Sequence, residues 1–119
     1  MKTANKVVVR NGQIVEAELV VQFFCDQKHK EVVAECPSLL IATSGKDLSH
    51  AKEMFKEACE LWIETINKDF DAREELENMG WKFTGMQAIS TSTKDLVDDL
   101  PLLSNNSIMF NIPAPTWAN

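Results

Sequence analysis

The chain has 119 residues, of which 45% are apolar and 25% charged, a composition that fits one folded domain and excludes a low-complexity or disordered chain. Twelve basic residues against 18 acidic ones give a net charge of −6, which disfavours DNA as a partner and favours a basic protein. No segment has the roughly 18 consecutive apolar residues of a membrane span, and the N-terminus lacks the apolar core of a signal peptide. We therefore expect a cytoplasmic protein that has no membrane partner.

The cysteine and histidine positions do not indicate a reactive or metal-binding site. Cys25, Cys36 and Cys59 lie in apolar surroundings without C-x-x-C spacing, so we expect reduced thiols that serve as small hydrophobic side chains. Neither His29 nor His50 has a Cys, Ser or Asp partner at a spacing that indicates a nucleophile or a metal. The sequence predicts His29 in a turn, His50 in the first turn of a helix, and no cofactor.

The first predicted element is a hairpin. Asn11-Gly12 favours the positive φ of a tight turn, so residues 7–10 should pair with residues 13–16. Residues 17–26 are β-branched and aromatic on both faces, which is typical of a central strand covered on each side.

A second hairpin is predicted through the polar residues 26–30 into a strand at 31–36. Pro37 cannot donate to a strand ladder, so it should end this strand, and residues 39–44 begin the next one.

After Asp47 the spacing of the apolar residues changes from every second residue to every third or fourth residue. Apolar residues from Leu48 to Ile66 recur at helical spacing, with Asp47 as the N-cap, and predict a long amphipathic helix. A shorter helix should start at Asp69 or Asp71 and stop at Gly80, and with Asp71 as its cap Glu74 would complete a capping box.

Residues 81–89 read as a final strand, which closes a domain over residues 1–89. Residues 90–119 differ in character. They hold a short amphipathic piece at 96–103 and an apolar, proline-punctuated extended stretch at 108–117. So many apolar side chains should not remain in water, so we expect an ordered C-terminal arm that packs on the core or on a sister subunit.

These elements predict an α+β fold, in which an antiparallel sheet is covered on one face by a long helix. The stretch VVAECPSLLIATSGKDLSHAKEMFKEACELWIET, with the later LENMGWK, resembles the HicB-like antitoxin family across residues 17–83 at the widest. The residues that carry the resemblance are Val33, Ala34, Glu35, Pro37, Leu39, Gly45, Asp47, Leu48, Ala51, Ala58, Leu61 and Trp62.

The resemblance implies a partial RNase H-like fold of order β-β-β-α-(α)-β, to which residues before Ala17 add an extra N-terminal hairpin strand. It also implies a non-catalytic antitoxin that binds a small, basic, mRNA-cleaving toxin. Many members carry a C-terminal DNA-binding domain, but from Ser90 onward this chain has Lys94 as its only basic residue. We therefore do not expect it to bind DNA.

The predicted partner-binding residues combine an acidic helix face with two aromatic residues: Glu53, Glu57, Glu60, Glu64, Trp81 and Phe83. The four glutamates recur at spacings of three and four and could receive a cationic surface. The alternatives are a solvated helix face for the glutamates and core packing for the two aromatic side chains. A second cover for the sheet would come from the arm or from a homodimer or higher homo-oligomer.

Two other functions stay open. Direct RNA binding would use the sheet and the basic cluster of Lys28, His29 and Lys30 in the 26–30 loop. A metal-dependent nuclease would require carboxylates that converge on shared ions, and the candidates on the core elements are Asp26, Glu35 and Glu57. Ordinary turn and surface roles explain all three carboxylates, so the sequence favours a protein that is not an enzyme.

Overall fold

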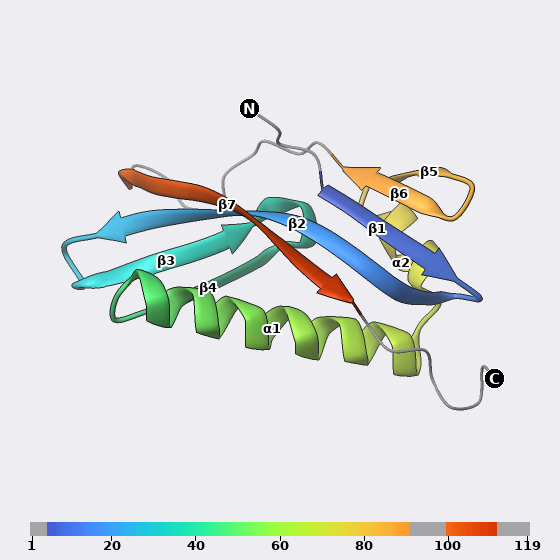
Figure 1. The fold of residues 1–119 in the computed structure, drawn as a ribbon, viewed down its shortest axis with the longest axis horizontal. Helices are drawn as coiled ribbons and strands as arrows, with labels where there is room; N and C mark the ends of the chain where they lie inside the picture. The colour runs from blue at the N-terminus through green and yellow to red at the C-terminus, as the bar shows by residue number, and fades with distance from the viewer. Residues whose placement is uncertain (1–4, 91–99, 112–119) are drawn as a thin grey trace.

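The computed structural model describes residues 5–90 and 100–111 and shows one antiparallel sheet with two helices (Figure 1). The predicted α+β class is confirmed, and the long helix lies under one face of the sheet. The elements are β1 (Asn5–Arg10), β2 (Gln13–Asp26), β3 (Glu31–Cys36), the 3₁₀ turn η1 (Pro37–Leu39), β4 (Ile41–Gly45), α1 (Leu48–Asp69), α2 (Ala72–Asn78), β5 (Lys82–Thr84), β6 (Gln87–Ser90) and β7 (Leu102–Asn111). The strand order is β4-β3-β2-β1-β6-β5, with β7 paired to β2.

Strand β2 is the axis of the sheet because three strands pair with it. β1 pairs with residues 13–18 of β2, β3 with residues 22–26, and β7 with residues 16–24. Because β7 overlaps both of the others, β1 and β3 must follow one another along one edge of β2, and β7 lies along the opposite edge. Figure 1 shows β7 passing across β2 where both strands twist.

A buried polar network fills the junction where β1 and β3 meet on β2. Asn5, which is 2% exposed, accepts a hydrogen bond from the Val20 N–H (2.7 Å) and donates one to the Ser38 hydroxyl (2.9 Å). The Ser38 hydroxyl also accepts a hydrogen bond from the Ser90 hydroxyl. The backbone carbonyl of Ser38 accepts one from the Trp81 indole N–H at 3.0 Å. The network therefore joins β1, β2, η1 and β6 where no strand ladder can continue.

Replacement of Asn5 by alanine should lower the free energy of unfolding by about 1–3 kcal/mol, because the partly buried Val20 N–H would lose its acceptor. Urea unfolding followed by Trp fluorescence measures this difference. Asn78→Ala, at an exposed position at the end of α2, is the matched control and should change stability by less than about 0.5 kcal/mol. Equal stabilities for the two variants would contradict a structural role of the Asn5 network.

Helix α1 begins and packs as its sequence predicts. The Asp47 carboxylate caps it by accepting from the His50 N–H at 2.8 Å. Its buried residues recur at spacings of three and four and face the sheet: Ala51, Phe55, Cys59, Ile63 and Ile66. The first turn lies directly against the end of β4, where a Cβ on Gly45 would come within 2.4 Å of the Ala51 nitrogen.

The turn of the first hairpin and the second helix are also confirmed. Asn11 and Gly12 both have positive φ, at 51° and 76°. Asp71 caps α2 by accepting from the N–H groups of Arg73 and Glu74, and Gly80 follows the helix with a φ of 95°.

The prediction of a single strand over residues 81–89 is wrong. These residues form the β5–β6 hairpin, with Gly85 in its turn at a φ of 63°. An isolated glycine within an apparent strand was the available signal for this break.

The C-terminal arm contributes a strand to the sheet. Residues 102–111 form β7, so this part of the arm packs on the core of its own chain, with Phe110 buried. The first half of the amphipathic piece, residues 96–99, and the stretch after residue 111 lie outside the described residues.

Candidate functional site

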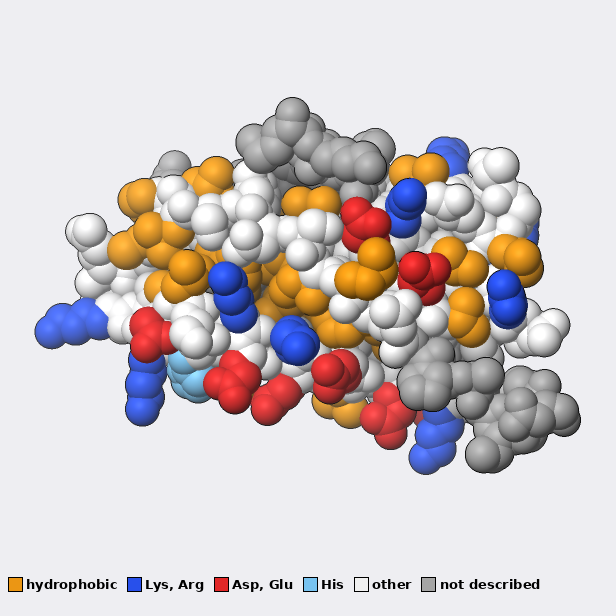
Figure 2. Space-filling model, in the orientation of Figure 1, with side chains coloured by type: hydrophobic (Ala, Val, Ile, Leu, Met, Phe, Trp, Pro, Cys, Tyr) orange, Lys and Arg blue, Asp and Glu red, His pale blue; other side chains and the backbone are white. Residues whose placement is uncertain are grey.

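The outer side of α1 carries four glutamates, Glu53, Glu57, Glu60 and Glu64, here called the acidic ridge. All four are exposed. At about 100° per residue they fall within about 60° of one another around the helix axis, and they point away from the buried face. Figure 2 shows acidic side chains along the lower edge of the molecule, over α1. From Glu53 to Glu64 the ridge extends about 16 Å, at 1.5 Å per residue.

The ridge is not neutralised within the part of the chain that the structure describes. The ion pairs found there join His29 to Asp26 and Arg73 to Glu77, and neither involves a ridge carboxylate. The ridge also holds like charges four residues apart, which repel one another. The neighbouring Lys52 turns toward the sheet, with its ammonium 5.9 Å from the centre of the Phe23 ring. The ridge carboxylates are therefore exposed without an ion pair among the described residues, and the exposed Lys56 lies beside them on α1.

The two aromatic residues of the predicted partner surface lie in different environments. Trp81 is 2% exposed and donates to the Ser38 carbonyl, so it belongs to the core and is not available to a partner. Phe83 is half-buried and carries the Arg73 guanidinium 4.5 Å above its ring.

The basic cluster of the RNA-binding alternative lies at the tip of the β2–β3 hairpin. Lys28, His29 and Lys30 are exposed there, as the sequence predicts. Asp26 and Glu31 face one another across the base of the same hairpin. Two carboxylates therefore accompany the basic cluster and weaken its attraction for a phosphate backbone.

Sequence reasoning missed a pairing at this hairpin. The Asp26 carboxylate accepts from the His29 N–H at 3.1 Å and bonds the His29 ring Nδ1 at 2.9 Å. With Glu31 they form the one group among the described residues whose ligand atoms all lie within 4.8 Å of one another. One imidazole and two carboxylates suit a divalent transition metal. The sequence signal for this pairing was an aspartate at the end of a strand, three residues before a histidine. At this spacing an aspartate side chain can accept a hydrogen bond from the backbone of the turn that follows it.

The same pairing shifts two pKa values in opposite directions. The hydrogen bond that the His29 ring makes to the Asp26 carboxylate raises the pKa of His29 above its ordinary 6.5, and the same bond lowers the pKa of Asp26 below 3.8. The stability that His29 contributes is complete below pH 6.5 and is lost as the pH rises through its raised value. The contribution of Asp26 is present above pH 3.8 and is lost as the pH falls through its lowered value.

We expect an NMR titration of His29 to give a midpoint above 6.5. Asp26→Asn should lower that midpoint, because the ring would lose its charged hydrogen-bond partner. A His29 midpoint that is unchanged by the substitution would contradict the pairing in solution.

The carboxylates of the nuclease alternative do not converge. Glu35 is fully buried in β3, and Glu57 is exposed on the outer side of α1. Asp26 lies opposite Glu31, four residues from Glu35 and hence about 13 Å along the strand. Because two shared metal ions lie about 4 Å apart, these three side chains do not form a two-metal site.

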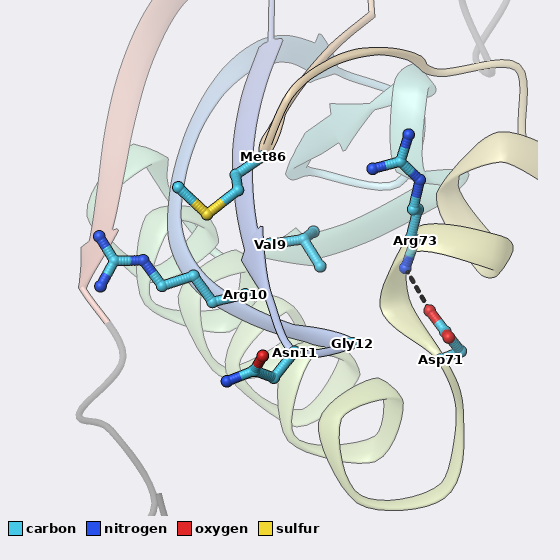
Figure 3. Close-up of a pocket in the computed structure, with 7 residues that line it drawn as sticks. All are labelled: Val9, Arg10, Asn11, Gly12, Asp71, Arg73 and Met86. Atoms are coloured by element: carbon cyan, nitrogen blue, oxygen red, sulfur yellow. Dashed lines mark hydrogen bonds between the residues drawn. The ribbon is translucent and has the colours of Figure 1, made fainter.

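One hollow, with a volume of about 400 Å³, lies between the first hairpin, α2 and the β5–β6 turn. In Figure 3 the side chains of Arg10 and Arg73 leave it in different directions. The Arg73 guanidinium is already bonded to the Gly85 carbonyl at 3.1 Å, and Asp71 brings a negative charge to the lining. The hollow therefore lacks the converging polar groups that orient a small ligand.

The three cysteines are free thiols, and Cys36 and Cys59 are buried. Burial raises the pKa of the Cys36 thiol to about 11 and raises the pKa of Cys59 as well. Neither is a nucleophile at neutral pH, because the thiolate is the reactive form.

Comparison with known proteins does not assign this chain to a family. No family model, curated protein or solved structure matches this chain. Within residues 5–90 and 100–111, neither helix is both long and apolar enough to span a membrane.

Proposed function

We propose that this chain is a HicB-like, antitoxin-type module that binds a small basic mRNA-cleaving protein and silences it without catalysis. The observation that carries the proposal is the acidic ridge, because four carboxylates on one exposed helix face have no cationic partner among the described residues. The resemblance of residues 17–83 to HicB-like antitoxins supplies the class of partner, and the partial RNase H-like fold is part of the same proposal.

The ridge would act by electrostatic complementarity. A net charge of −6 attracts a cationic protein over long range and speeds the encounter. Lysine and arginine side chains that bind RNA would then pair with the ridge carboxylates. Because the same cations cannot contact an RNA phosphate at the same time, occupation of this surface would block the substrate of the toxin.

The experiment uses the product of a small basic reading frame that adjoins the gene for this chain. We expect that product to cleave a labelled mRNA and to lose this activity when the full chain is added in equimolar amount. Salt should weaken the complex, since exposed charges are screened. Persistent cleavage in the presence of excess chain, at low salt, would refute the antitoxin proposal.

A further inference from the structure

The longest open edge of the described sheet belongs to β7. Within residues 5–90 and 100–111 this strand pairs with β2 alone. The other strands at the margins are short: β5 has three residues, and β4 has five and ends against the first turn of α1. By contrast, β7 presents ten residues. An edge of this length is a template on which another strand can form hydrogen bonds.

Strand β7 lacks the charged and proline residues that usually protect an edge strand, and its pairing with β2 is irregular only near one end, where Leu103 falls out of register. Its sequence LLSNNSIMFN contains neither charge nor proline, although 30 of the 119 residues of the chain are charged (12 basic and 18 acidic). Leu102, Leu103 and Met109 are each about half exposed. Lysine, proline or an inward charge is the common protection against pairing between edges, so the composition of β7 favours pairing.

The sequence of β7 indicates that the partner strand is a second copy of itself. Side-chain character along the strand is nearly palindromic, with apolar residues at 102–103 and 108–110 and Ser and Asn at 104–107. Antiparallel pairing about a twofold axis at Asn106 sets Leu103 opposite Met109 of the second copy, and polar residues opposite one another at the centre. A basic partner would find no carboxylate on this strand.

The direction of the backbone groups fits such a pairing. The Val20 N–H points to Asn5, on the edge of β2 that carries β1 and β3. By strand alternation the N–H of Val21 points to β7, and that of its partner Asn106 points back to β2. The N–H groups of Ser107 and Met109 therefore point to the open edge.

From these observations we propose that two copies of the chain associate through antiparallel pairing of their β7 strands, which joins the two sheets into one. The dimer uses none of the ridge carboxylates, because all four lie on α1. The proposal therefore stands or falls separately from the proposed function.

The test is the mass of the full chain in solution, measured by light scattering or sedimentation equilibrium at high micromolar concentration. We expect twice the chain mass of 13.4 kDa. Met109→Lys should halve that mass by placing a charge in the seam. Leu61→Lys is the matched control, since Leu61 is 65% exposed on α1 and the change in charge is the same, and it should stay dimeric.

A second variant and a second measurement guard against a folding defect. Ser107→Pro removes an outward N–H while the β2–β7 ladder keeps its own hydrogen bonds, so it should also give the single-chain mass. In the wild type, the Ser107 and Met109 amides should exchange slowly with solvent and lose this protection on dilution. A monomeric wild type, or a dimer that persists in both folded β7 variants, would overturn the proposal.

Discussion

Glu57→Lys combined with Glu60→Lys should weaken binding of the basic partner by about 100-fold, which corresponds to two lost charge pairs of about 1.4 kcal/mol each. Both residues are exposed at the centre of the acidic ridge. The reversal replaces attraction by repulsion without touching the buried face of α1. Isothermal titration calorimetry with the purified basic protein measures the change.

The control for this double variant reverses two charges elsewhere. Glu74→Lys with Glu77→Lys, at exposed positions of α2, changes the net charge from −6 by the same +4 and should weaken binding far less. If both double variants lose affinity equally, the affinity depends on the net charge of the chain, and the ridge is not the contact surface. Unchanged affinity in the ridge variant would place the partner elsewhere on the molecule.

The largest expected effect on stability comes from Gly45→Ala. A Cβ at Gly45 would lie 2.4 Å from the Ala51 nitrogen and 2.7 Å from the His50 carbonyl carbon, both of which are backbone atoms that no side-chain rotation can move. The first turn of α1 would have to shift away from β4. We expect a loss of about 2 kcal/mol or more in the free energy of unfolding, within the range for overpacked cores.

Thermal and urea unfolding measure this loss, with Ser44→Ala as the control at the neighbouring exposed position. That control should remain within about 0.5 kcal/mol of the wild type. If Gly45→Ala is as stable as the wild type, α1 does not approach β4 as closely as described.

Local signals in the sequence predicted the elements that local interactions determine. Asn11-Gly12 predicted the first hairpin because few other residue pairs adopt two successive positive φ values. Asp47 and Asp71 predicted the helix starts because their carboxylates satisfy free N–H groups within three residues. The exposed position of the acidic ridge was likewise predictable, since helical periodicity fixes which side chains share a face.

Contacts distant in sequence could not be predicted in this way. Asn5 bonds Ser38, 33 residues away, and Trp81 bonds the Ser38 carbonyl from 43 residues away. A pattern within a few consecutive residues cannot indicate hydrogen-bond partners that lie this far apart in the sequence. Its neighbours in the chain therefore leave Trp81 open between core packing and the partner surface, and the tertiary structure decides for the core.

The sequence by itself determined the helices, the turns of the first two hairpins, the α+β class and the side of α1 that carries the acidic charge, because each depends on residues within a few positions of one another. The tertiary structure alone decided that residues 102–111 lie along β2, that β1 and β3 share one of its edges, and that the opposite edge ends in an uncharged strand. Strand pairing over such separations depends on how the whole chain buries its apolar faces, which no short window of sequence contains.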